Sequence, residues 1–290
     1  MSNAPPPITG LIRFSFFGMN DTRQKHHDMD VAFGQVYNST RMEARLYLFE
    51  NLCLPSLRAQ TDQDIRIVIL TSEIMPKPYK DRLRNVTTDV PNIQIYFSQG
   101  REIRGALKPY MRDHEIKDRA VNFRLGEDDA ISCQYIKRLR QVSISMPERS
   151  HISFPKGIIS TPNPAVVQVS GVCTHLCPSP SLVRITGQSF RKNPYKTMHD
   201  AVWKTFPTET DPGFAAYIMT LHGHNDTAAR IDVRNKNVRE NSYRMGRREG
   251  NKAVQRQLAE NIPHLTQDRL QTIMANQILT QPDHEPEETH

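Results

Sequence analysis

The chain has 290 residues, of which 37% are hydrophobic and 24% charged, and its formal net charge at pH 7 is +7. This length and apolar content can form a core, which excludes wholesale disorder, and 13 glycines and 20 prolines are too few for a collagen-like or low-complexity protein. No stretch approaches the ~18 apolar residues of a membrane-spanning helix, the polar first ten residues do not resemble a signal peptide, and only four cysteines are present. We therefore expect a cytoplasmic protein with free thiols.

Apolar runs alternate with helix-like segments through the first half of the chain. Runs rich in β-branched and aromatic residues predict buried strands at 11–17, 65–70, 93–97 and 120–125. Apolar spacing predicts helices at 41–57, 79–86, 107–114 and 133–142, and the polar segment 19–38 is expected to be a loop. Because strand–helix alternation is typical of parallel sheets, we predict an α/β fold with a mostly parallel sheet flanked by helices.

The second half is less regular. Short β-like pieces within 151–184 are broken by proline and glycine, which favours an antiparallel or irregular extension of the sheet. Two helices are expected at 252–260 and 266–279. We predict one domain over 1–250, a C-terminal helical extension over 251–280 and a frayed acidic tail over 281–290.

Three acidic residues, Glu127, Asp128 and Asp129, come directly after the predicted strand 120–125. Packed carboxylates raise one another's pKa unless a cation neutralises them, and the carboxyl edge of a parallel sheet is where α/β proteins bind ligands. Carboxylate oxygens suit Mg²⁺ or Mn²⁺, often together with phosphate oxygens. The cluster therefore predicts a metal–diphosphate site, and the alternative is a solvated acidic turn that caps the next helix.

Four segments together resemble a known family. They are RFSFFG at 13–18, NLCLPSLRAQTDQDIRIVILTS at 51–72, AVNFRLGEDDAIS at 120–132 and TLHGHND at 220–226. The set is similar to the putative rhamnosyltransferase family of bacterial glycosyltransferases with the GT-A fold, over Arg13 to Arg230. The resemblance implies an inverting transfer of rhamnose from a nucleoside-diphosphate sugar to a glycan or glycolipid hydroxyl, in polysaccharide biosynthesis. Residues 1–250 would then be the catalytic domain.

The resemblance also implies roles for particular residues. Phe17, Gly18, Thr71 and Ser72 would lie near the base or ribose of the donor. The acidic cluster would be a DxD-like motif, with Asp128 and Asp129 on the Mn²⁺ or Mg²⁺ ion and Glu127 as a further ligand or ribose contact. Gly126 stands where the family more often has aspartate, so the register of the motif, Glu127 with Asp129 or a degenerate 126–128, stays open.

The late motif 220–226 supplies His222 as a candidate metal ligand, with Asn225 as a polar contact, whereas His224 is expected to be a solvated loop residue. An inverting transfer needs a general base for the acceptor hydroxyl. We prefer Asp211 for this role, with Glu209 and Asp200 as alternatives, and each also fits an ordinary turn or cap.

The segment 230–256 carries nine basic and three acidic residues, a local excess of +6. Three interpretations remain: a solvated loop, an arginine clamp on the diphosphate, and peripheral docking on the anionic inner face of the membrane. Nucleic-acid binding is disfavoured because Tyr243 is the only aromatic residue among the basic ones. Cys173, His175 and Cys177 do not complete a zinc site.

Two rival functions remain, of which the first uses the same acidic cluster and the second has a degenerate DxD that no longer holds metal. One is a metal-dependent nucleotidyltransferase or phosphohydrolase, which would release a nucleoside monophosphate from a nucleotide-sugar. The other is a non-catalytic nucleotide-sugar-binding module.

Overall fold

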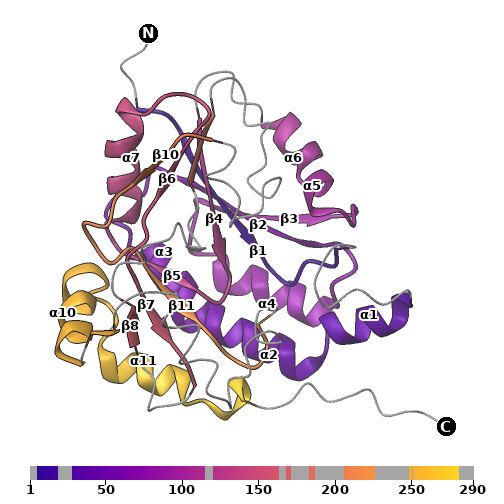
Figure 1. The fold of residues 1–290 in the computed structure, drawn as a ribbon. Coiled ribbons are helices and arrows are strands. Elements are labelled where there is room, and N and C mark those ends of the chain that lie inside the picture. Colours follow the sequence, from indigo (N-terminus) through magenta and orange to yellow (C-terminus); the bar gives the residue numbers. More distant parts are fainter. Residues whose placement is uncertain are drawn as a thin grey trace.

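The computed structural model describes residues 5–18, 28–114, 120–162, 168–170, 183–186, 206–225, 248–249 and 251–280. Within these residues the chain forms a seven-stranded sheet, a five-stranded sheet and helices that cover them (Figure 1). The larger sheet has the strand order β10-β6-β9-β4-β1-β2-β3, and the smaller one has the order β12-β8-β7-β11-β5.

The centre of the larger sheet is parallel. It is built from β1 (Ile8–Arg13), β2 (Arg66–Ser72), β3 (Ile93–Ser98) and β4 (Ala120–Gly126), with β1 paired to both β2 and β4. β1, β2 and β4 are almost entirely buried, as expected for a parallel sheet covered on both faces. Their carboxyl ends consequently meet at one edge, where Gly126 lies opposite Arg13.

The rest of this sheet is mixed. β9 (Val183–Thr186) runs antiparallel between β4 and β6 (Ser150–Ser153), and β10 (Thr208–Thr210) pairs in parallel with β6 at the edge. The prediction of a mostly parallel α/β sheet with an antiparallel extension after residue 150 is therefore confirmed.

The smaller sheet joins distant parts of the chain. β11 (Tyr217–Thr220) runs parallel to β7 (Gly157–Ser160) and antiparallel to β5 (Ala130–Ile131). β8 (Gln168–Ser170) and β12 (Arg248–Glu249) extend it. Because Ile218 pairs with Ala130, the residues after β11 pass beside those that precede β5.

Alternate strand residues face two helical layers. Ile12, Ile67 and Ile69 share a core cluster with the first layer, which consists of α2 (Ser39–Leu48), η1 (Phe49–Cys53), α3 (Leu54–Arg58), α4 (Lys77–Thr87) and α7 (Tyr135–Ser145). Leu11, Val68 and Leu70 pack with the second layer, α5 (Ile103–Ala106) and α6 (Lys108–Asp113).

Two local predictions were wrong. The first strand ends at Arg13 instead of Phe17, because Ser15 adopts a left-handed conformation with φ 39° that interrupts extended backbone. The expected loop 19–38 contains helix α1 (Met29–Val36), which begins where Asp28 Oδ1 accepts from the backbone N of Asp30 at 2.8 Å.

The C-terminal helices share a core with the sheet domain. Val254 and Leu258 of α10 (Asn251–Asn261) and Ile273 of α11 (Gln267–Met274) cluster with residues of α2, β7 and β11. Figure 1 shows α10 and α11 together beside β7 and β8. The short helix η5 (Gln277–Leu279) follows, and the tail 281–290 lies outside the described residues.

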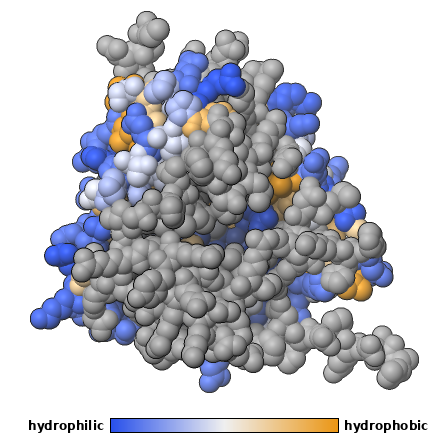
Figure 2. Space-filling model, viewed as in Figure 1, coloured by the Kyte–Doolittle hydropathy of each residue, from blue (hydrophilic) through white to orange (hydrophobic). Residues whose placement is uncertain are grey.

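In the face shown in Figure 2, hydrophilic residues cover most of the described surface, and apolar residues form small separate patches. Among the helices of the described residues, none combines the length and apolar character needed to cross a membrane.

Candidate functional site

The acidic cluster lies in the turn that links β4 to β5, at the carboxyl edge of the parallel strands. Glu127, Asp128 and Asp129 are all buried, with exposed fractions of 4%, 6% and 8%. Each carboxylate has different hydrogen-bond partners, which come from three separate parts of the chain.

Asp128 contacts the loop that follows β11. Its Oδ2 lies 3.1 Å from His222 Nε2 and accepts a hydrogen bond of 2.9 Å from Asn225 Nδ2. The Thr220 hydroxyl donates to the backbone oxygen of Asp128 at 2.8 Å. The antiparallel pairing of β11 with β5 thus brings residues 220–225 to the acidic cluster, although His222 is 94 residues from Asp128 in the sequence.

Asp129 turns toward the strand itself, and its Oδ1 accepts from the Thr220 backbone N at 2.9 Å. Gly126 makes room for both aspartates, because a Cβ atom there would lie 2.7 Å from Asp129 Oδ2 and 2.8 Å from Asp128 Oδ1. The glycine at this position therefore allows the two carboxylates to fold back over the end of β4.

Glu127 points toward α2. Its Oε1 accepts from Arg45 Nη1 at 2.8 Å and from the Ser15 backbone N at 3.4 Å. Arg41, one helical turn before Arg45, donates to the Val36 carbonyl at 2.8 Å. Sequence reasoning missed both arginines, although two cations one turn apart on the buried side of a predicted helix are a recognisable signal.

The protonation of the cluster follows from burial and neighbouring charges. Burial and then the Asp128 charge raise the pKa of Asp129 well above its usual range, and burial also raises the pKa of Glu127 despite Arg45. Burial opposes ionisation of Asp128 too, but the hydrogen bond with His222 and the Arg45 charge leave the pKa of Asp128 below its usual value. Burial lowers the pKa of His222, so Asp128 is ionised beside a neutral imidazole.

The residues expected near the nucleotide lie at the ends of β1 and β2. The Phe17 backbone N donates to Ser72 Oγ at 2.8 Å, which ties the two strand ends together. The Arg101 guanidinium stands 5.1 Å from the centre of the Phe17 ring. Thr71 is fully buried, and a Cβ on Gly18 would lie 3.2 Å from the Arg101 carbonyl oxygen.

The candidate bases occupy other positions. Asp211 follows β10, where its Oδ2 pairs with Arg138 Nε at 2.7 Å and its Oδ1 accepts from Gly213 N at 2.9 Å. Glu209 is exposed on β10. In the larger sheet, β6 and β9 lie between β10 and β4, and neither of these two hydrogen bonds of Asp211 involves the acidic cluster. Asp200 lies outside the described residues, as do Cys173, His175 and Cys177.

Asp128 and His222 are the residues of this site that could bind a divalent ion. No group of three or more His, Cys, Asp or Glu side chains among the described residues is arranged to hold a metal. Mg²⁺ and Mn²⁺ are commonly held by one or two carboxylates, with water and substrate phosphate as the other ligands, and Asp128 fits this pattern. His222 Nδ1 accepts from the His224 backbone N at 3.3 Å, so Nε2 carries the proton and coordinates only after a tautomer change.

His224 has a different environment from His222. Its Nε2 lies 2.8 Å from the Ile278 carbonyl oxygen, and the side chain is fully buried against the C-terminal segment. The expectation of a solvated His224 was therefore wrong, because η5 packs over this loop.

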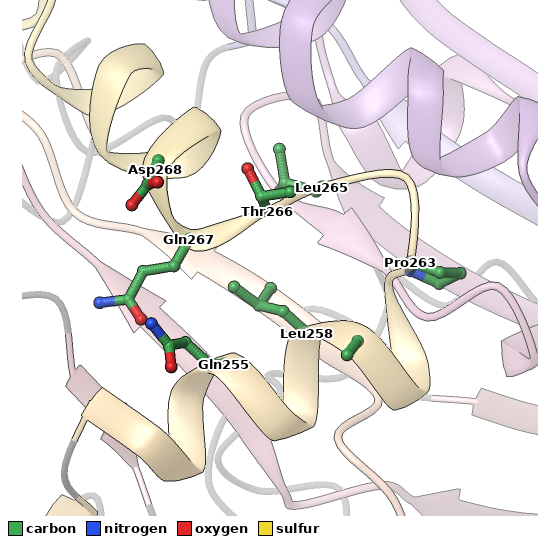
Figure 3. Close-up of a pocket in the computed structure, with 8 residues that line it drawn as sticks. Gln255, Leu258, Pro263, Leu265, Thr266, Gln267 and Asp268 are labelled. Carbon is green, nitrogen blue, oxygen red and sulfur yellow. The ribbon is translucent and has the colours of Figure 1, made fainter.

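A separate half-open cavity of about 280 Å³ lies between α10 and α11 (Figure 3). Leu258 and Leu265 provide apolar walls, and the side chains of Gln255 and Gln267 point toward one another across it. None of the residues that line this cavity belongs to the acidic cluster or to the loop after β11.

Comparisons with known proteins identify a family. A family model described as "putative rhamnosyl transferase" matches residues 7–234. No curated protein is similar enough to match the chain.

Among solved structures, Staphylococcus aureus TarS 1-349 in complex with UDP-GlcNAc is 11% identical with a TM-score of 0.41, covering 77% of this chain and 61% of that one. The mannosyltransferase PcManGT from Pyrobaculum calidifontis, in complex with GDP-Man and Mn²⁺, is 13% identical with a TM-score of 0.42, covering 94% and 75%. The chain therefore spans less than two thirds of the TarS structure.

Proposed function

Because the chain belongs to the putative rhamnosyl transferase family of glycosyltransferases, we propose that it moves a sugar from a nucleoside-diphosphate donor to a hydroxyl of a glycan or glycolipid. The family description supports rhamnose as the sugar. The observation that carries the proposal is the contact between Asp128 and the His222–Asn225 loop at the carboxyl edge of the parallel strands.

This contact joins the two motifs that sequence resemblance assigns to one site. A buried, ionised carboxylate and a buried, neutral imidazole are gathered with a half-buried amide where α/β sheets bind ligands. A buried carboxylate attracts a cation strongly, because low-dielectric surroundings strengthen its charge interactions. The site is thus suited to an anionic ligand that arrives with a divalent metal.

We propose that Asp128 holds Mn²⁺ or Mg²⁺, with His222 as a second ligand and Asp129 in support. A divalent ion at this position supplies neutralisation of the charge that grows on the leaving diphosphate. Asn225 orients the Asp128 carboxylate by donating to Oδ2. Phe17, Gly18, Thr71 and Ser72 would hold the base and ribose, since the ends of β1 and β2 border the same edge.

The transfer is proposed to be inverting, which requires a base for the acceptor hydroxyl. The candidates remain Asp211, Glu209 and Asp200. Replacing each candidate with its amide identifies the base: the variant of the true base should have a lower kcat but an unchanged affinity for the donor. The segment 230–256, of which 230–247 and 250 lie outside the described residues, is proposed to contact the diphosphate or an anionic membrane.

The proposal is tested by incubating the protein with a panel of nucleotide-sugars, Mn²⁺ and candidate acceptors, followed by product analysis. Release of a nucleoside diphosphate that requires both acceptor and metal supports a glycosyltransferase. Release of a monophosphate without acceptor would instead support a nucleotidyltransferase or phosphohydrolase, and no turnover with any donor would contradict the transferase proposal.

A further inference from the structure

Helix α2 carries two buried arginines toward the acidic cluster. Arg41 and Arg45 are one helical turn apart and only 3% and 4% exposed. Removing a guanidinium from water is costly unless a partner compensates its charge. Arg45 has such a partner in the acidic cluster, whereas Arg41 donates to the Val36 carbonyl.

The partner of Arg45 is Glu127. Arg45 Nη1 lies 2.8 Å from Glu127 Oε1, with both side chains almost fully buried at 5% and 6% exposed. The Ser15 backbone N donates to the same oxygen at 3.4 Å, and Arg41 Nη1 lies 3.5 Å from the Ser15 hydroxyl. The left-handed Ser15 is thus held between Glu127 and Arg41, and hydrogen bonds and the ion pair connect α2, the end of β1 and the turn after β4.

Within this arrangement, the side chains of the three consecutive acids point in different directions. Glu127 turns to α2, Asp128 turns to the loop after β11, and Asp129 accepts from the Thr220 backbone. Without the Arg45 cation, the buried Glu127 carboxylate would lose its ion-pair partner while it stays next to Asp128, and only the weaker influence of Arg13 would oppose its charge. It would then repel Asp128 or compete with it for any cation.

We propose that Arg45 is a positioning residue for donor binding: it holds Glu127 against α2, so that Asp128 faces His222 and is the carboxylate presented to the ligand. This inference rests on the proposed function, since it concerns the same site. It assigns Arg45 an effect that acts through Glu127, without a contact between Arg45 and the donor.

The test is a double-mutant cycle of Arg45→Met and Glu127→Gln, read by calorimetry with UDP, dTDP and GDP in the presence of Mn²⁺. Arg45→Met alone is expected to weaken nucleoside-diphosphate binding by about 10–100-fold, the range for residues that orient metal ligands. In the Glu127→Gln background the same change is expected to have little effect, within about 3-fold, because the neutral amide no longer needs a cation. Arg45→Lys, which keeps the charge, is expected to recover part of the affinity.

Arg82→Met is the matched control. Arg82 on α4 also pairs with two glutamates, Glu43 of α2 and Glu50 of η1, each at 2.6 Å, and neither glutamate belongs to the acidic cluster. Its loss is expected to lower the melting temperature without changing affinity.

Equal binding by Arg45→Met and the wild type would overturn the inference. So would a further large loss on adding Arg45→Met to Glu127→Gln, since that would show a direct contact between Arg45 and the ligand. If Arg45→Met does not fold, the comparison of the double variant with Glu127→Gln still decides. Failure of the wild type to bind any nucleoside diphosphate would instead contradict the proposed function itself.

Discussion

Asp128 Oδ2 lies within hydrogen-bond distance of the side chains of His222 and Asn225. Of the three acids in the cluster, Asp128 is the one whose pKa lies below its usual value. We expect Asp128→Asn to abolish Mn²⁺-dependent nucleoside-diphosphate binding with little change in melting temperature, because the amide keeps the shape but not the charge. Asp129→Asn is expected to weaken binding as well. Asp89→Asn, at an exposed ion pair with Arg58, is the control. Unchanged affinity in both cluster variants would count against the site.

Substitutions of the two histidines in the motif 220–226 should have different effects, one on metal affinity and the other on stability. His222→Ala removes the imidazole beside Asp128, so metal affinity falls. His224→Ala removes a buried contact with the Ile278 carbonyl, so it lowers the free energy of unfolding by about 1–3 kcal/mol and leaves metal affinity nearly intact. Metal titrations and urea unfolding of both variants check this order, and the reverse order of metal affinities would show that the wrong histidine was assigned.

Gly126 should be sensitive to the smallest substitution. In Gly126→Ala the added methyl group would lie within 3 Å of both aspartate carboxylates, so these side chains must move. We expect at least a tenfold loss of donor affinity, comparable to the loss of an orienting contact, which is about 10–100-fold. Gly34→Ala, where a Cβ meets no atom within 4 Å, is the control. Wild-type affinity in Gly126→Ala would mean that the carboxylate positions do not matter.

Some residues of the site could be predicted from the sequence, and others could not. The acids and His222 stand in short motifs that can be recognised without a structure. Arg45 contacts the cluster only because the tertiary fold brings α2 to the end of β4, and the sequence around Arg45 contains no motif that indicates a contact with Glu127.

At the scale of elements, α1 is joined to the end of β1 through aromatic contacts. The rings of Tyr37 and Phe33 are 4.9 Å apart, and Tyr37 also stacks with Phe17 at 6.2 Å. Burial raises the pKa of Tyr37 from 10.0 to about 12, despite opposing effects of Ser72 and Arg41. The neutral phenol is therefore favoured in the folded state.

The raised pKa of Tyr37 predicts how the stability of the protein depends on pH. The neutral Tyr37 phenol stabilises the folded state fully below pH 10, and this stabilisation is lost as the pH rises through 12, a total of about 3 kcal/mol. The free energy of unfolding of the wild type should therefore fall relative to Tyr37→Phe between these two pH values and run parallel to it below pH 10. Parallel curves over the whole range would contradict the burial of Tyr37 in this contact.

The C-terminal helices are expected to be essential to stability, whereas the tail is not. Leu258 on α10 is 1% exposed within the cluster shared with β7 and β11, so Leu258→Ala should cost about 2–5 kcal/mol in urea unfolding. Deletion of 281–290 should leave the melting temperature unchanged. A large loss on deletion, or none in Leu258→Ala, would reverse this assignment.

Most strands and helices were predictable because their apolar periodicity is local. The boundaries that failed depend on single residues: Ser15 ends β1 by its backbone conformation, and Asp28 begins α1 as a cap within a polar segment. The helix predicted at 41–57 is present, because α2, the π-turn η1 and α3 follow one another without a break from Ser39 to Arg58.

At the scale of the whole molecule, the parallel order of β1 to β4 follows from strand–helix alternation. The smaller sheet does not, because β5 and β12 are two-residue strands that pair with distant partners and carry no periodic signal. That sheet matters for function, since the pairing of β11 with β5 is what brings His222 to Asp128.

The most direct test of the account is calorimetric titration of the intact protein with nucleoside diphosphates, with Mn²⁺ and with a chelator. We predict binding of at least one of UDP, dTDP and GDP that requires the metal and disappears in Asp128→Asn. Equally tight binding in the presence of the chelator, or wild-type affinity in Asp128→Asn, would contradict a donor site built on the contact between Asp128 and His222.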